Sequence, residues 1–187
     1  MLKNCKAYLC GPVELDPDCR SWRLTLSKQL RDIGIEPINP LEKPSWLNNT
    51  GPGMQKQIKE QILTGDLSSI NTNINIRKYC LALVRMSDII IVNLHNLHTV
   101  GSFEEINECK YKPIFILSNE EIPSLWLMDQ LNMYHTRDYY IHSGSLDDSI
   151  RKLIDALKHI DSGISKPYES SIDEMIKWIF ITRNASK

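Results

Sequence analysis

The amino-acid sequence predicts an α/β fold, a five-stranded parallel sheet in the order 2-1-3-4-5 with helices on both faces. Short apolar segments alternate along the chain with segments of helical spacing, which is typical of repeated β-α-β units. The segment Asp88–Leu94 is β-branched and apolar on both faces, as a central strand of a parallel sheet must be. A length of 187 residues suits one domain of this kind and is too short for two ordinary ones.

The first half of the chain begins with a clear βαβ pattern, and from residue 41 the regular spacing of apolar residues stops. The elements expected here are strands over residues 6–10 and 35–38 and a helix over about residues 18–32. Gly11-Pro12 ends the first strand, and Gly34 follows the helix as its C-terminal cap. From residue 41 to about residue 73, proline, glycine and asparagine interrupt the pattern, which predicts a long functional loop.

The second half returns to regular alternation, and helical spacing resumes at Ile76 before the central strand. The elements expected after that strand are helices over about residues 102–110, 124–131 and 146–160 and strands over residues 113–117 and 139–142. Ser145 is a good N-cap for the last helix. We therefore assign residues 1–160 to one domain of flavodoxin-like strand order and residues 161–187 to a linker and a helical tail.

Composition excludes several classes of function. The net charge of −1, from 22 basic and 23 acidic residues, argues against a partner that is a nucleic acid polymer. Five cysteines without a CxxC pair argue against a disulfide framework. The start of the chain has no apolar signal region, and no apolar run is long enough to cross a bilayer, so we expect no membrane association and a cytoplasmic location.

Parallel sheets bind ligands beyond the carboxyl ends of their strands, at the switch point between the first and third strands. The loops that follow these two strands are residues 11–18 and 95–105. Within them we take Gly11, Pro12, Gly101 and Ser102 as substrate-binding positions. Free N–H groups at the start of the helix after the third strand would bind an anion.

Glu105 is the candidate reactive group. We expect a carboxylate in the first turn of this helix to be stabilised as an anion, and such a group can form a covalent ester with a sugar carbon. The alternative is purely structural, because Ser102-x-x-Glu105 is also a capping box, which needs no substrate. Glu104 and Glu108 share another face of the helix, and a solvated one is the simplest interpretation.

Three segments resemble the nucleoside 2-deoxyribosyltransferase family. Tyr8-Leu-Cys-Gly11-Pro12 is similar to the family's YLAGP opening. Asp88-Ile-Ile-Ile-Val followed by Gly101-Ser-Phe-Glu-Glu105-Ile is similar to its strand and G-T-x-x-E block, and Lys112-Pro-Ile to its G-K-P-V strand. The match spans about residues 6–160 in order and spacing. The family includes glycosidases that act on 2′-deoxynucleoside 5′-monophosphates and pass the sugar to water.

The resemblance implies roles for particular residues. Glu105 takes the place of the family's nucleophile, and no metal or organic cofactor is implied. Thr99 replaces an Asp that holds a sugar 5′-hydroxyl, which favours a nucleotide ligand. Cys80 replaces an acid that assists the leaving base. Ser124 lies in a segment that reaches the neighbouring subunit's site, and together with an apolar tail over residues 172–181 it predicts a homodimer or higher homo-oligomer with sites near the subunit contacts.

Several of the remaining candidates have two interpretations. Glu14 could hydrogen-bond a base or a sugar hydroxyl, or be a surface charge. Trp46 could stack on a base, or cover the core as a loop residue. His95 and His98 are better explained as solvated or ligand-contacting donors than as metal ligands, because no third ligand is fixed. Trp22 fits the core, and Asp88 is interpreted as structural.

These observations favour N-glycosyl transfer or hydrolysis at C1′ of a 2′-deoxynucleoside or its 5′-monophosphate through a glycosyl-glutamate. The alternative is a nucleotide-binding module on the same fold that has lost catalysis, suggested by Cys80 and by the polar segment after Glu105.

Overall fold

A computed structural model describes residues 2–13, 19–42, 52–95, 100–109, 112–119 and 138–162. The strands are β1 (Lys6–Cys10), β2 (Glu36–Ile38), β3 (Ile89–Asn93), β4 (Ile114–Ser118) and β5 (Asp138–His142). They form one sheet in the order β2-β1-β3-β4-β5, and every neighbouring pair is parallel. The predicted parallel sheet, with the order 2-1-3-4 around the switch point and helices on both faces, is confirmed.

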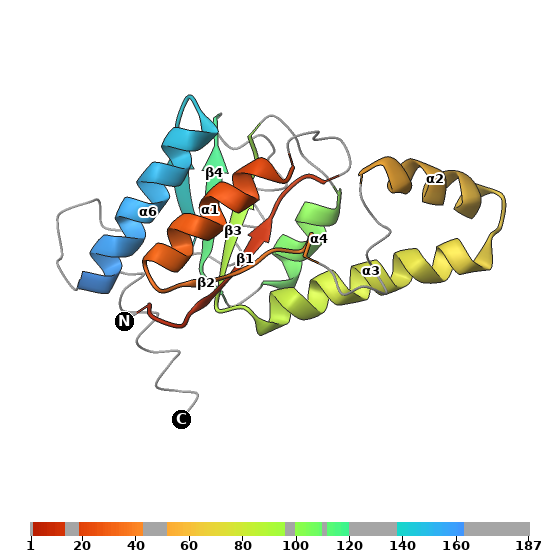
Figure 1. Cartoon of the computed structure of the whole chain (residues 1–187), viewed down its shortest axis with the longest axis horizontal. Helices are drawn as coiled ribbons and strands as arrows, with labels where there is room; N and C mark the ends of the chain where they lie inside the picture. The colour runs from red at the N-terminus through yellow and green to blue at the C-terminus, as the bar shows by residue number, and fades with distance from the viewer. Residues whose placement is uncertain are drawn as a thin grey trace.

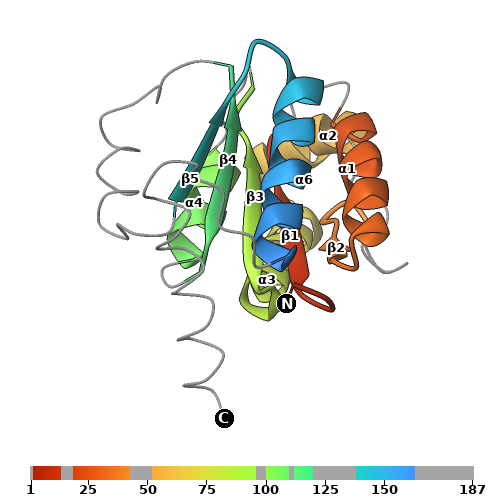
Figure 2. The same ribbon diagram turned by 90° about the vertical axis from the view of Figure 1, so that its left-hand side faces the viewer.

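The helices form two layers, one on each face of the sheet (Figures 1 and 2). Helices α1 (Ser21–Asp32) and α6 (Leu146–Ser162) cover one face, and α3 (Leu67–Met86) and α4 (Val100–Glu108) cover the other. Successive strand residues point to opposite faces. Leu9, Ile91 and Phe115 therefore pack against α1 and α6, whereas Tyr8, Cys10 and Val92 pack on the side of α3 and α4.

The prediction of a long loop over residues 41–73 is wrong for most of its length, because two helices occupy it. Helix α2 (Pro52–Leu63) is followed by α3, and Figure 1 shows the pair as a hairpin that extends beyond the edge of the sheet. Asp66 caps α3 by accepting hydrogen bonds from the N–H groups of Ser68 and Ser69. Helices that pack against little of the hydrophobic core need no continuous apolar stripe. The helical spacing of apolar residues is therefore weak in this segment.

Two helix caps agree with the predictions made from the sequence. Gly34 follows α1 with a φ of 80°, in the left-handed region that a C-terminal cap uses. Ser145 caps α6, since its Oγ accepts a hydrogen bond from the Asp148 N–H at 3.2 Å. The assigned boundary at residue 160 lies inside α6. The expected helix over residues 124–131 and the tail from residue 163 onwards, with the subunit contact assigned to them, lie outside the described residues.

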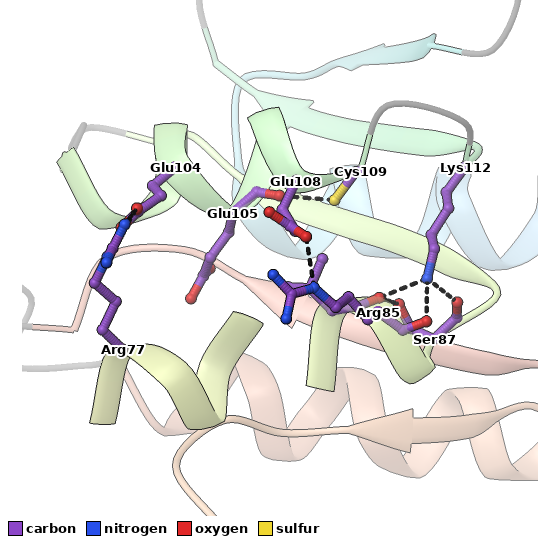
Figure 3. A network of polar contacts seen from close by, with 9 residues as sticks. Arg77, Arg85, Ser87, Glu104, Glu105, Glu108, Cys109 and Lys112 are labelled. Carbon is purple, nitrogen blue, oxygen red and sulfur yellow. Dashed lines mark hydrogen bonds and ion pairs between the residues drawn. The ribbon is translucent and has the colours of Figure 1, made fainter. Parts of the chain in front are cut away.

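Two polar contacts fix the starts of the inner strands. Asp88 Oδ2 accepts a hydrogen bond from the Lys6 N–H at 2.7 Å, which ties the beginning of β3 to that of β1. Lys112 Nζ, just before β4, donates to the carbonyl groups of Val84, Arg85 and Ser87 and so satisfies the C-terminus of α3 (Figure 3). In the part of the chain that the structure describes, no helix is long and apolar enough to span a membrane.

Candidate active site

Glu105 lies on the second turn of α4 and reaches the end of β1. The Tyr8 hydroxyl donates a hydrogen bond of 2.6 Å to its Oε1 atom. Tyr8 is completely buried in the layer between the sheet and α3 and α4. Burial and the neighbouring Glu105 charge raise the pKa of the Tyr8 hydroxyl well above its ordinary value, so this group remains a donor at neutral and moderately alkaline pH.

The protonation of Glu105 differs from the expectation for a helix N-terminus. Burial of the carboxyl group raises its pKa above the ordinary value, whereas hydrogen bonds from Tyr8 and Cys10 and the charge of Arg23 act in the opposite direction. Glu105 lies beyond the first turn, where the helix dipole is felt most strongly. The predicted first-turn stabilisation of the anion is therefore wrong, and the side chains of neighbouring elements set its charge instead.

The capping-box alternative is also wrong. Helix α4 begins at Val100, two residues earlier than expected, so Ser102 lies inside the helix and not at its N-cap. Ser102 is buried, and its carbonyl oxygen accepts a long hydrogen bond of 3.8 Å from the Cys10 thiol. The backbone N–H groups that the first turn leaves without intrahelical acceptors include those of Val100 and Gly101. A Cβ atom built on Gly101 meets no described atom within 4 Å.

Glu104 and Glu108 share a partly exposed face of α4, in line with the prediction, and each also forms an ion pair with α3. Glu104 pairs with Arg77, and Glu108 pairs with Arg85 at 2.6 Å. Figure 3 shows Glu105 pointing into the region between these two pairs. The pair with Arg77 lowers the pKa of the Glu104 carboxyl, which makes Glu104 a fixed anion beside the Glu105 group. The three acidic side chains of α4 therefore have different surroundings.

The turn after β1 approaches β3 and α1 very closely at Gly11. A Cβ atom placed there would lie 3.0 Å from Trp22 Cζ2 and 3.3 Å from the Asn93 carbonyl oxygen. Glycine is required at this position because a side chain would clash with these atoms, and not because the backbone has a positive φ value. Asn93 ends β3 and is buried, and its Oδ1 atom accepts a hydrogen bond from the His95 N–H at 3.0 Å. Gly11 and Asn93 therefore meet where β1 and β3 end, and Glu105 hydrogen-bonds to Cys10, the last residue of β1.

Arg23 is a buried residue of this region that sequence reasoning did not single out. Its guanidinium donates hydrogen bonds to the carbonyl oxygens of Leu9, Gly11, Pro12 and Cys19. Pro12, a predicted substrate-binding residue, contributes its carbonyl oxygen as one of these acceptors. One signal could have revealed Arg23: it lies on the flank of the apolar face of α1, three residues before Leu26.

The other sequence candidates divide into those the structure places and those it does not. His95 is buried, and its Nε2 atom lies 3.0 Å from Ser149 Oγ of α6, so the interpretation as a solvated donor is wrong. Cys80 is half-buried on α3, on the helix face that it shares with Arg77 and Val84, and lies near enough to Tyr8 that a Cys80 thiolate would raise the pKa of the Tyr8 hydroxyl. The candidates outside the described residues are Glu14, Trp46, His98, Thr99 and Ser124. Among the described residues no cluster of His, Cys, Asp and Glu could hold a metal ion.

No family model matches the chain. No curated protein matches it either. Among solved structures, it is similar to the CMP N-glycosidase BcmB of Clostridium botulinum, with 14% identity and a TM-score of 0.49 over 79% of this chain and 97% of that one. It is also similar to the 2-deoxyribosyltransferase of Bacillus psychrosaccharolyticus, with 18% identity and a TM-score of 0.47 over 67% of this chain and 82% of that one.

A third similar structure is the azoreductase of Bacillus anthracis str. Sterne, with 11% identity and a TM-score of 0.36 over 94% of this chain and 98% of that one. The first two structures are of the kind that the sequence motifs resemble, a 2-deoxyribosyltransferase and an N-glycosidase.

Proposed function

We propose that the protein transfers or hydrolyses the N-glycosidic bond at C1′ of a 2′-deoxynucleoside or its 5′-monophosphate. The observation that carries the proposal is the Glu105 carboxyl group, held at the strand ends by the Tyr8 hydroxyl. A carboxylate fixed on one side leaves its remaining lone pairs for a sugar carbon, and a held orientation removes much of the entropic barrier to attack. The sequence motifs around β1, β3 and α4 support the same reaction.

The chemistry proceeds in two displacements. A Glu105 carboxylate oxygen forms a bond to C1′ while the bond from C1′ to the base nitrogen breaks, and the electron pair leaves with the base. Water or a second base then attacks C1′, and the ester bond breaks to return the carboxylate. When water is the acceptor, the proton that it loses balances the charge of the departed base. Two displacements at one carbon retain its configuration.

The second candidate function is nucleotide binding without turnover. Cys80 is the observation that favours it, because it lies beside Tyr8, where the resembling family carries an acid that assists the leaving base. A thiol is a weaker proton donor to a leaving base than a carboxylic acid, because its ordinary pKa of about 8.5 is well above that of a carboxylic acid.

One assay separates the two functions. The protein is incubated with 2′-deoxynucleosides and their 5′-monophosphates, each with and without a second free base, and the released base is measured by chromatography. Base released only when an acceptor is present indicates a transferase, and base released in water indicates a glycosidase. Saturable binding of the nucleotide without any base release would support the binding module and contradict the enzyme.

We expect a 5′-monophosphate to bind more tightly than the corresponding nucleoside. Thr99 carries no negative charge that would repel a phosphate, and it is followed in the sequence by Val100 and Gly101, whose N–H groups open α4 without intrahelical acceptors. Titration calorimetry with the Glu105→Gln protein measures both affinities without turnover. An affinity for the nucleoside equal to that for the nucleotide would contradict this expectation.

Replacing Tyr8 by phenylalanine should move the acid limb of the pH–rate profile to higher pH. The Tyr8 hydrogen bond lowers the pKa of Glu105, so its loss raises that pKa further and reduces the ionised fraction at a given pH. The rate should therefore fall more at pH 6 than at pH 8, as measured by base release across the pH range. A uniform loss of rate at all pH values would show that Tyr8 orients Glu105 without tuning it.

A further inference from the structure

Arg23 places a full positive charge inside the protein next to the candidate site. The residue is the third of α1, and its side chain has no exposed surface. Its Nε atom donates to the Leu9 carbonyl at 3.3 Å and its Nη2 atom to the Gly11 carbonyl at 2.8 Å. Its Nη1 atom donates to the carbonyl oxygens of Pro12 and Cys19. One side chain thus joins both ends of the segment that links β1 to α1.

All four of these acceptors are neutral carbonyl groups. A buried charge is costly unless an opposite charge or several dipoles compensate it. The two carbonyls of Leu9 and Gly11 flank Cys10, whose thiol hydrogen-bonds toward α4 at the Ser102 carbonyl and at Glu105. The guanidinium of Arg23 and the carboxyl group of Glu105 therefore approach the same residue of β1 from different helices.

We propose that Arg23 is a positioning residue of the site, which fixes the turn after β1 and places there a buried positive charge that favours the carboxylate form of Glu105. The ionised form is the one that the proposed reaction requires, so the inference rests on the proposed function of Glu105. The burial and the four hydrogen bonds of Arg23 fix its place, and its charge opposes the effect of burial on Glu105.

Other groups around Glu105 act on its protonation as well. From β1, Tyr8 and Cys10 donate hydrogen bonds that favour the anion; from its own helix, Glu104 disfavours it. On α3, Cys80 acts on Tyr8, and Arg77 is neutralised by Glu104. Among these described groups Arg23 is the cation whose charge favours the Glu105 anion directly.

The test measures the ionisation of Glu105 and does not depend on activity. The protein is labelled with ¹³C at the glutamate carboxyl carbon, and the Glu105 resonance is assigned by its absence in Glu105→Gln. Its titration is then followed in the wild type, in Arg23→Gln, in Arg23→Lys and in Arg85→Gln. Arg85→Gln is the matched control, because it removes an exposed arginine that pairs with Glu108 on the same face of α4 and leaves the pair of Arg77 with Glu104 intact.

We expect the Glu105 pKa to rise in Arg23→Gln and to stay near the wild-type value in Arg85→Gln. Arg23→Lys should keep the titration close to the wild type because it retains the charge, although it satisfies fewer carbonyls and lowers the melting temperature. An unchanged titration in a folded Arg23→Gln protein would overturn the proposal and leave Arg23 a purely structural residue. This result would stand whether or not the protein releases base, so it is distinguishable from a failure of the proposed reaction.

If Arg23→Gln does not fold at neutral pH, the proposal assigns the failure to the Glu105 carboxylate, which has lost its compensating positive charge. The proposal then predicts that folding is recovered in the double variant Arg23→Gln/Glu105→Gln, in which no carboxylate remains to be compensated. Circular dichroism and thermal melting of the single and double variants measure this recovery. A double variant as unfolded as the single one would overturn the electrostatic role.

Discussion

Replacing Glu105 by glutamine will abolish base release and leave the fold intact. If Glu105 is the nucleophile, loss of its carboxylate should lower kcat by at least about 10³-fold, since removing a nucleophile disables the whole reaction sequence. The glutamine Oε1 atom can still accept the hydrogen bond from Tyr8, so ligand binding should persist. Base release measured by chromatography and nucleotide binding measured by calorimetry check the two parts separately.

The same substitution should make the protein more stable at neutral pH. Burial raises the pKa of Glu105 in the folded state above its ordinary value of 4.5, so the folded state binds the proton more tightly than the unfolded state. The free energy of unfolding therefore falls as pH rises from the ordinary value through the raised one. Glutamine avoids this cost. The melting temperature of Glu105→Gln should therefore exceed that of the wild type at pH 7, by roughly 2–4 °C for each kcal/mol gained, and equal it at pH 4.

Glu104→Gln is the matched control for both readouts. It changes the adjacent carboxyl group, but that group is paired with Arg77 on the α3 side and not with Tyr8. Removal of a partly exposed ion pair has a small effect on stability. Full activity in Glu105→Gln, or an inactive but folded Glu104→Gln protein, would contradict the assignment of the nucleophile.

Replacing Gly11 by alanine is expected to disturb the fold and the site together. The new methyl group would lie 3.0 Å from Trp22 Cζ2 and 3.2 Å from Asn93 Cβ, closer than such atoms normally approach. Overpacking of this kind costs about 1–3 kcal/mol. The displaced turn would also lose its hydrogen bond from Arg23, so base release should fall by more than the folded fraction does. Thermal melting and the assay of base release measure the two effects.

Gly144→Ala serves as the control, because a Cβ atom there meets no described atom within 4 Å and the backbone has no positive φ. Its melting temperature and activity should stay near those of the wild type. If Gly11→Ala behaves like Gly144→Ala, then Trp22 and Asn93 move aside readily, and the turn does not require glycine.

The strands could be predicted from the sequence because their burial leaves a local pattern. All five residues of β3 are buried, and only β-branched and apolar side chains, with one asparagine at the end, occupy them. The hairpin of α2 and α3 could not be predicted in the same way. Among the α2 side chains that the structure describes, Ile58 alone is buried, so tertiary contacts impose little periodicity on that segment.

The site could be predicted in outline and not in its electrostatics. The resemblance to the deoxyribosyltransferase motif, through the spacing from Gly101, predicted Glu105, and the rule for parallel sheets predicted the ends of the first and third strands. The Tyr8 contact joins residues 97 positions apart, so it depends on the packing of α4 against β1. Arg23 was missed because arginine is normally exposed, and nothing local indicates that four backbone carbonyls surround it.

The alternation of side chains along the strands has a consequence for engineering this protein. Odd-numbered positions of β1 and β3, such as Leu9 and Ile91, belong to the layer with α1 and α6, whereas Tyr8 and Cys10 belong to the layer that carries Glu105. A library aimed at thermostability can therefore randomise the first layer and leave the reacting groups untouched. A library aimed at a new substrate belongs in the second, and Arg23 is the position that neither library should vary.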